Sequence, residues 1–248
     1  MSYPSPPDPS RPATPPPAPA GQYSPDGHWY WTGREWTPVG FQWPPWARPY
    51  TPSQSRATAA VVLVATVAAG TALGGLAQVV DLVMALTTPG PGASLPQAIL
   101  LLVGLLPYVV GTIGAAIAVP IWMHRAYRNL PALGEQGMHW SPAWAAGGWF
   151  IPFVNLAVPY LVMRDLWSRF GDARALPQQW WTAAVGGLLL RSVGGAFYGP
   201  AAVFNRPLGD VLGILGNTAL VLAGYLVIVM MLRISRLQRD RQVQLQSR

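Results

Sequence analysis

The stretch Trp149–Pro159, WFIPFVNLAVP, decides how the rest of the chain is arranged. It is apolar enough for a membrane, yet it contains Pro152 and Pro159 with Asn155 between them. A proline inside a helix removes one backbone hydrogen bond and clashes with the carbonyl four residues earlier. Broken backbone is tolerated at membrane depth only where protein buries it or water reaches it. The stretch therefore either crosses the bilayer as a kinked helix, or enters it and turns back.

The composition indicates a membrane protein. Of the 248 residues, 51% are hydrophobic and 10% are charged, whereas about a quarter of the residues in a soluble domain are charged. The net charge of +7 reflects 16 arginines and no lysine, and the arginines lie beside apolar segments. This placement favours anchoring at a membrane face over nucleic-acid binding. The exclusive use of arginine, with abundant alanine, glycine and proline, indicates a GC-rich bacterial genome and hence a bacterial plasma membrane.

The predicted fold class is an all-α integral membrane protein. A transmembrane helix needs about 20 apolar residues, and four segments meet this requirement: residues 57–80, 98–119, 180–204 and 211–232. The segment around the two prolines, Trp144–Met163, is a fifth. Together they give a membrane domain over residues 57–237, followed by a basic, polar C-terminal tail at 238–248.

The distribution of arginines distinguishes the two possibilities for Trp144–Met163. If all five segments span, the arginines divide seven to eight between the two faces. If this segment turns back, fourteen lie on the side of the N-terminus and only Arg206 lies on the other, with Arg191 inside a span. Cytoplasmic loops are enriched in lysine and arginine. We therefore expect four transmembrane helices plus one re-entrant or Pro-kinked segment at 144–163, with both termini cytoplasmic.

The N-terminal residues read as an appendage to this domain. The first twenty contain nine prolines and lack the basic start and apolar core of a signal peptide, so residues 1–22 are predicted to be a disordered Pro-rich tail. Residues 23–55 begin with the turn sequence SPDG and continue with HWYW and REWTPV, which is typical of a small hairpin. Trp29, Trp31 and Trp36 either form a binding module for a protein partner or lie against the membrane surface.

The centre of the chain carries a pattern of three short sequences, WMHRAYRNL, SPAW and GGWFIPFVNLAVPYLVMRDLW. This pattern resembles the bacterial membrane proteins grouped as domain of unknown function 4328 (DUF4328). The resemblance is specific over residues 122–167, looser from about 57 to 240, and absent from the N-terminal tail. It implies a multi-span membrane domain and implies no activity. The matching positions are Trp122, Arg125, Asn129, Leu130, Pro142, Trp144, Trp149, Phe150, Pro152, Asn155, Leu156, Pro159, Met163, Asp165, Leu166 and Trp167.

Arginines supply the candidate binding sites. Arg191 lies near the middle of the predicted span 180–204, where a charge costs at least about 2.5 kcal/mol unless it has a partner or water. Asp81 is the only acid near the interior of an earlier span, so an Asp81–Arg191 ion pair is predicted. The pair is either a site for an anion or lipid head group, or purely structural. Arg125 and Arg128 share a helix face and are predicted to contact anionic head groups, worth about 1 kcal/mol each.

No residue pattern indicates catalysis, a metal or a cofactor. The chain has no cysteine, which excludes disulfides and thiol chemistry. The histidines His28, His124 and His139 have no second ligand nearby, whereas a metal needs three or four. No Ser-His-Asp order with supporting glycines occurs. The leading functional prediction is a non-enzymatic scaffold or partner subunit that recruits others through its cytoplasmic tail. The alternative is a small transporter or channel using residues 149–159 and Arg191, and a membrane enzyme comes third.

Overall fold

The computed structural model describes residues 29–31, 36–38, 48–87, 94–170, 175–198 and 206–247. The chain divides into two units, Met1–Pro44 and Pro45–Arg248. In the first, strand β1 (Trp29–Trp31) pairs antiparallel with β2 (Trp36–Pro38), and Trp31 lies opposite Trp36. These strands occupy the two aromatic runs of the predicted hairpin. The predicted disordered tail, residues 1–22, lies outside the described residues.

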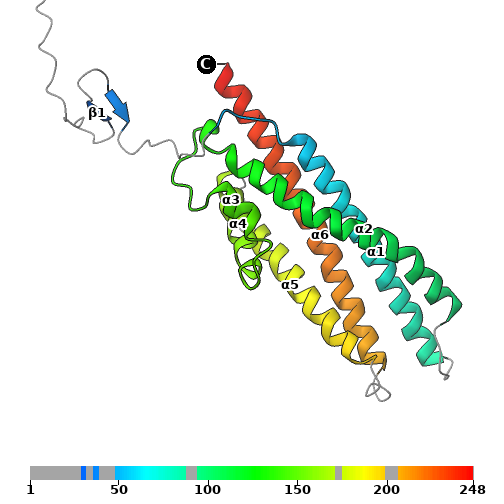
Figure 1. The fold of residues 1–248 in the computed structure, drawn as a ribbon. Helices are drawn as coiled ribbons and strands as arrows, with labels where there is room; N and C mark the ends of the chain where they lie inside the picture. Colours follow the sequence, from blue (N-terminus) through cyan, green and yellow to red (C-terminus); the bar gives the residue numbers. More distant parts are fainter. Residues whose placement is uncertain are drawn as a thin grey trace, which may run out of the picture. The chain divides into compact units, whose positions relative to one another are not determined.

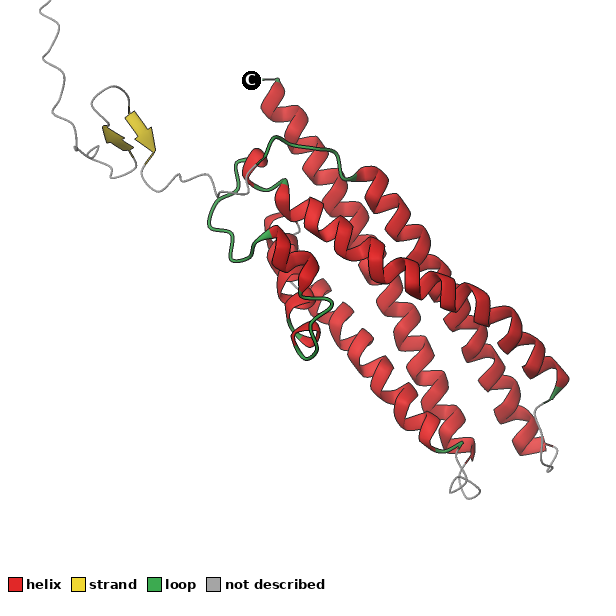
Figure 2. Ribbon diagram, in the orientation of Figure 1, coloured by secondary structure: helices red, strands yellow, loops and turns green. Residues whose placement is uncertain are grey.

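The described secondary-structure elements of the second unit are all helices, joined by loops (Figures 1 and 2). Helix α1 packs against α2 and α6, and α6 packs against α5. The four long helices are α1 (Gln54–Thr87), α2 (Leu95–Arg128), α5 (Ala175–Ala196) and α6 (Arg206–Gln246). With 34 residues each, α1 and α2 are about 50 Å long. They therefore extend well beyond a hydrocarbon core of about 30 Å.

Three of these helices, α1, α2 and α6, are long and apolar enough to cross a membrane. They contain three of the four predicted spans, at 57–80, 98–119 and 211–232. The remaining predicted span, 180–204, corresponds to α5, which is not in this set and ends at Ala196. The reason is its composition, because its first turns contain the polar pair Gln178 and Gln179 and its last two turns contain Arg191.

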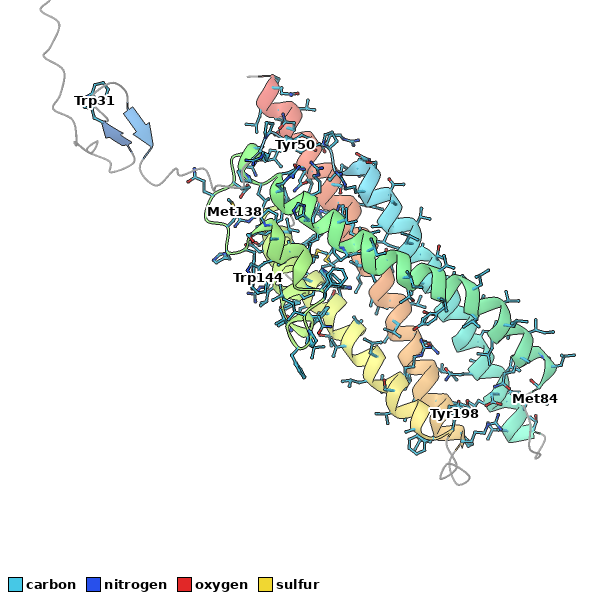
Figure 3. The ribbon with its side chains drawn as sticks, viewed as in Figure 1. Trp31, Tyr50, Met84, Met138, Trp144 and Tyr198 are labelled. Atoms are coloured by element: carbon cyan, nitrogen blue, oxygen red, sulfur yellow. The ribbon has the colours of Figure 1, made fainter. Side chains whose placement is uncertain are left out.

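The helix ends gather into two groups. At one end, which we call the arginine end, α1 and α5 begin while α2 and α6 finish (Figure 1). Asn129, just after α2, exchanges two hydrogen bonds of 2.9 and 3.2 Å with the backbone of Thr51, just before α1. At the opposite end, the Asp81 end, Arg206 at the start of α6 pairs with Asp81 near the end of α1. Figure 3 shows Tyr50 and Trp144 at the arginine end and Tyr198 at the Asp81 end.

The chain between α2 and α5 begins and ends at the arginine end. It contains the 3-10 turns η1 (Pro131–Leu133) and η2 (Val154–Leu156), and the helices α3 (Pro142–Gly147) and α4 (Val158–Phe170). The segment Trp144–Met163 is thus a short helix, an irregular turn and the start of a second helix.

The two prolines of this segment have different roles. Pro152 lies in the irregular stretch next to Phe153, whose backbone adopts a positive φ of 64°. This conformation is rare for a residue with a side chain. Pro159 is the second residue of α4, where a helix has no internal partner for the missing N–H and tolerates the ring. One proline therefore accompanies the break, and the other helps to start the next helix.

The two halves of the bundle pack differently. At the arginine end, large side chains of α2, α4 and α6 are fully buried, among them Trp122, Tyr127, Trp167 and Met231. Toward the Asp81 end, helices approach through glycines. A Cβ added to Gly187 of α5 would lie 2.9 Å from the carbonyl oxygen of Gly216 of α6. Small residues permit such close approach between membrane helices.

Candidate functional site

Several positions of the DUF4328-like pattern hold the arginine end together. The Trp122 indole Nε1 donates to Ser235 Oγ at 3.0 Å, which ties α2 to α6 in the buried core. The Arg233 guanidinium lies 5.4 Å from the ring centroid of buried Trp167. Asn129 fixes the chain before α1 through its two hydrogen bonds to Thr51. These residues position the helices at the arginine end, and Trp167 also borders a cavity of about 460 Å³ beside α4.

Other positions of the pattern form an exposed apolar loop between α3 and α4. Phe153 is 85% exposed, and Phe150 and Leu156 are exposed as well. Pro152 and Asn155 share this exposure, as does Trp144 on α3, whereas Trp149 is partly buried and Pro159 is buried. The Trp181 indole Nε1 donates to the Leu156 carbonyl at 3.1 Å. The loop is therefore fixed to the start of α5 while its apolar side chains point outward.

A network of charges links α2, α4 and the chain that follows η1. Asp165 accepts hydrogen bonds from Tyr127 Oη at 2.7 Å and from Arg169 at 3.2 Å, and Arg169 also pairs with Glu135 at 3.0 Å. Burial lowers the pKa of Arg169, but the Asp165 and Glu135 carboxylates raise it by more than burial lowers it. The pKa of Arg169 therefore lies above its ordinary value. Each acid in the network is already satisfied by donors. We therefore assign the network to structure. Among the described residues, no three His, Asp or Glu side chains gather closely enough to hold a metal ion.

Arg125 and Arg128, the predicted head-group contacts, lie in the last turn of α2. Arg56 from the first turns of α1 joins them, since all three arginines interact electrostatically with His124. Within the described part of the chain, none of the three forms an ion pair with an acid. Their contact with anionic head groups stays a prediction, now with Arg56 as a third member.

The predicted ion pair between Asp81 and Arg191 is wrong. Asp81 is buried and accepts two hydrogen bonds from the Arg206 guanidinium, at 2.6 and 3.0 Å. Arg191 lies deeper in the bundle, where its guanidinium carbon is 4.9 Å from the ring centroid of Tyr108. Arg206 takes the acid because it starts α6 beside the end of α1. The sequence predicted Arg206 to lie in a loop between two spans, and it gave no sign that Arg206 is the partner of Asp81.

Arg191 borders an open cavity of about 160 Å³ between α1, α2, α5 and α6. Polar side chains from α1, α2 and α6 share this lining: Thr71, Gln78, Tyr108 and Asn217. Asn217 Nδ2 donates to Gln78 Oε1 at 2.8 Å. No carboxylate lies within ion-pair distance of Arg191 in the part of the chain that the structure describes. We call this cavity and its lining the Arg191 pocket.

Glycines create the space and the close contacts of this pocket. A Cβ on Gly70 would lie 2.6 Å from the backbone nitrogen of Tyr108, and one on Gly216 would lie 2.7 Å from that of Arg191. The Gln78 amide lies directly against Gly213 of α6. The glycines thus bring α1, α2, α5 and α6 close enough for their polar side chains to meet.

The Arg191 pocket has the chemistry of an anion site. A guanidinium presents a planar set of donors that fits carboxylate and phosphate oxygens. The face of Tyr108 holds the cation in place, while the amides of Gln78 and Asn217 supply further polar groups. An uncompensated charge inside a membrane protein is costly, so an anion or water must satisfy Arg191.

These features define the class of the protein. Three apolar helices of membrane-spanning length and an arginine inside the bundle are those of a multi-span membrane protein. The family model described as domain of unknown function (DUF4328) matches residues 92–236, which is more than half of the chain. The chain therefore belongs to this family, and the resemblance predicted from its central pattern is confirmed. No curated protein and no solved structure matches the chain.

Sequence reasoning missed most of the pocket. Gln78 and Asn217 lie within predicted spans, and a search for polar residues inside the apolar segments would have found them. Tyr108 gives no such signal, because a tyrosine inside an apolar run is unremarkable by itself. The family match begins at residue 92, so it covers Tyr108, Arg191 and Asn217 but not Gln78.

Proposed function

We propose that the protein binds an anionic ligand in the Arg191 pocket and acts as a small, non-enzymatic membrane transporter. The observation that carries the proposal is Arg191 itself, a partly buried cation that faces a cavity of about 160 Å³ and has no carboxylate partner among the described residues. The ligand class is a small anion with a carboxylate or phosphate group, because these match the guanidinium donors.

The proposed topology has four spans, α1, α2, α5 and α6. Helix α5 runs beside α6 from the arginine end to the Asp81 end through close glycine contacts, which supports its role as the fourth span despite its lower hydropathy. The exposed loop Phe150–Ala157 enters the bilayer only at the interface, where tryptophan and tyrosine are enriched. Trp181 and Tyr160 stack beside it with ring centroids 6.4 Å apart.

The proposed orientation places the arginine end in the bacterial cytoplasm. All described arginines except Arg191 and Arg206 lie on segments at this end. Positive residues are enriched on the cytoplasmic side of membrane proteins. Since α1 begins and α6 finishes there, both termini of the chain are cytoplasmic in this proposal.

A path of polar side chains favours access to the pocket from the Asp81 end. On α1, Asp81, Gln78 and Thr71 lie on one face, spaced three and seven residues apart. Ten residues of helix cover about 15 Å, which is half of a hydrocarbon core of about 30 Å. Beyond Thr71, the buried side chains Val64 and Val227 close the bundle. A path closed on one side supports a transporter with alternating access over an open channel.

The test of anion binding uses purified protein in nanodiscs of zwitterionic lipid. Thermal unfolding is followed at increasing concentrations of inorganic phosphate or acetate. A bound ligand stabilises by about 2.7 kcal/mol at one hundred times its Kd. We expect saturable stabilisation of the wild type, partial retention in Arg191→Lys and loss in Arg191→Gln.

Arg164→Gln is the matched control for this test. Arg164 also lies over a tyrosine ring, Tyr160, at 5.6 Å, but it is exposed at the arginine end. This variant is expected to bind anions like the wild type. Equal stabilisation of Arg191→Gln and the wild type by phosphate and acetate would refute the proposed function.

Scaffolding through the N-terminal tail is the second candidate. One observation favours it: residues Met1–Pro44 form a unit of their own that contains the aromatic hairpin. Deleting residues 1–44 distinguishes the candidates. A scaffold loses a co-purifying partner and keeps its stability, whereas a transporter keeps its anion binding unchanged. Loss of anion binding on deletion would argue against the pocket as an independent site.

A further inference from the structure

A second polar site lies at the Asp81 end, and its charges do not balance. We call it the Asp210 site, and it consists of Asp81, Tyr198, Arg206 and Asp210. Arg206 and Asp210 are four residues apart in the first turns of α6, so they share a helix face. The single guanidinium forms two hydrogen bonds with Asp81. One cation therefore faces two carboxyl groups.

Asp210 is the carboxyl group that forms no hydrogen bond with the Arg206 guanidinium in this arrangement. Its side chain is fully buried, at 0% exposure. One oxygen, Oδ1, accepts a hydrogen bond from Tyr198 Oη. The other, Oδ2, is buried and has no hydrogen-bond partner within the described residues. An ionised carboxylate with a bare oxygen in a buried site is strongly unfavourable, and a second carboxylate nearby makes ionisation less favourable still.

We infer that Asp210 is a proton-binding site and that its proton favours anion binding in the Arg191 pocket. The proton sits on Oδ2 as a carboxylic O–H, which removes the bare charge, while Oδ1 keeps the hydrogen bond from Tyr198. Tyr198 is 43% exposed, so Asp210 is one hydrogen bond away from the surface of the Asp81 end. Carboxylates inside membrane proteins commonly serve as proton relays.

The site and the pocket are physically continuous. Asp210, Gly213 and Asn217 are spaced three and four residues apart on α6 and lie on one face. Gln78 fills the space over Gly213, accepts a hydrogen bond from Asn217, and lies beside the Tyr198 hydroxyl. Seven residues of helix separate Asp210 from Asn217, which corresponds to about 10 Å.

The sign of the coupling follows from charge. A proton lost from Asp210 leaves a negative charge about 10 Å from the pocket, and this charge repels an anion bound at Arg191. The proton and the anion therefore bind together more tightly than either binds alone, and each raises the affinity for the other by the same factor. At this separation in a partly hydrated protein, we expect about a tenfold change in affinity. This coupling rests on the proposed anion site.

Among the described residues, the charged or titratable groups that face Asp210 all belong to the same small set. Asp81 comes from α1, Tyr198 follows α5, and Arg206 belongs to α6, while Gln78 of α1 is neutral. Because Arg206 is already paired with Asp81, Asp210 is the group whose change of charge the pocket senses.

The first experiment detects the proton without any ligand. Infrared spectra of the whole protein in nanodiscs are recorded between about pH 5 and pH 10. This range lies between the ordinary pKa values of carboxyl groups and of tyrosine. We expect the carbonyl stretch of a buried protonated carboxylic acid in the wild type and its loss in Asp210→Asn. Asp240→Asn, which removes an exposed acid further along the same helix, is expected to keep the band. A band of equal strength in Asp210→Asn and the wild type would overturn the inference.

The second experiment measures the coupling. Phosphate affinity is measured from thermal stabilisation across the same pH range, with acetate as a second anion that titrates differently. The wild type and Asp240→Asn are expected to bind about tenfold more weakly once Asp210 loses its proton. Asp210→Asn, which imitates the protonated acid, is expected to bind tightly at every pH. A pH profile of Asp210→Asn identical to the wild type, or a wild-type effect that requires sodium instead of protons, would overturn the coupling.

The two proposals fail in different ways. If Arg191→Gln keeps anion binding, the proposed function fails while the infrared band of Asp210 still tests the proton site. If the band is insensitive to Asp210→Asn but Arg191→Gln abolishes anion binding, the proton site fails and the anion pocket stands.

Discussion

Replacing Gly187 by alanine should loosen the contact between α5 and α6, whereas the same change at Gly186 should not. A Cβ on Gly187 would lie 2.9 Å from the Gly216 carbonyl oxygen and 3.1 Å from the Leu220 backbone nitrogen. These are backbone atoms, so neither can turn aside as a side chain would. A Cβ on Gly186 meets no atom within 4 Å. The two positions are adjacent on one helix and differ in what faces them.

The magnitude follows from this geometry. Ordinary contacts of a Cβ begin at 3.4 Å, so α5 and α6 must separate by several tenths of an ångström along a contact that also positions Arg191. Overpacking of a tight interface costs about 1–3 kcal/mol. Alanine in place of glycine inside a helix stabilises by about 0.5–1 kcal/mol. Gly187→Ala should therefore lose about 1–2 kcal/mol net, and Gly186→Ala should gain up to about 1 kcal/mol.

Reversible unfolding in mixed micelles gives the free energy of unfolding of both variants. Phosphate binding gives an independent measure, because displacement of α5 moves Arg191 relative to Tyr108, and Gly187→Ala should bind more weakly as well. Equal unfolding free energies in the two variants would refute the glycine-packing account of the Asp81 end. So would unchanged phosphate binding in a Gly187→Ala protein that is measurably destabilised.

Three further predictions concern the arginine end. Asn129→Ala removes both hydrogen bonds to the chain before α1 and should cost about 1–3 kcal/mol of unfolding free energy; a cost near zero would show that the chain before α1 is not fixed there. Phe153→Cys, the sole cysteine of the chain, carries a polarity-sensitive dye that should report a lipid environment in liposomes, and emission typical of water would contradict interfacial insertion of the loop. Arg125→Gln with Arg128→Gln should weaken stabilisation by phosphatidylglycerol by about 1 kcal/mol per arginine in low salt, while the exposed Arg236→Gln control should not.

The bundle could be predicted from the sequence because long apolar runs constrain the chain strongly. The limits of its helices could not. α2 continues through WMHRAYR to Arg128, and α6 continues through the predicted polar tail to Gln246. Helical hydrogen bonding continues wherever tertiary packing supports it, and buried Gln238, which donates to the Ala126 carbonyl at 2.8 Å, supplies that support on α6. Hydropathy detects the part of a helix that lies in lipid and says little about its polar ends.

The partner of Asp81 was beyond sequence reasoning for a different reason. Which residues face one another across two helices depends on how far one has slid along the other. Here the sliding is fixed by close glycine contacts, such as that of Gly194 with Gly209 at 2.9 Å between the added Cβ and the carbonyl oxygen. A glycine in an apolar run indicates that another helix packs closely there, but it does not identify which residues of that helix make the contact. Arg191 was therefore found from sequence, whereas its surroundings required the structure.

The positions of Arg191 and Arg206 connect the proposed anion site to the proposed topology. In the proposed orientation, Arg206 is the one described arginine outside the spans that lies on the side opposite to that favoured by the positive-inside rule. Asp81 neutralises it through two hydrogen bonds of 2.6 and 3.0 Å, so this exception carries no net charge. Arg191 receives no such partner from the described residues, although Asp210 lies about two turns of helix from Asn217 in the same pocket. In the proposed function, the arginine at this end is neutralised by the protein, and the charge of Arg191 beside its cavity is left for an anion from outside.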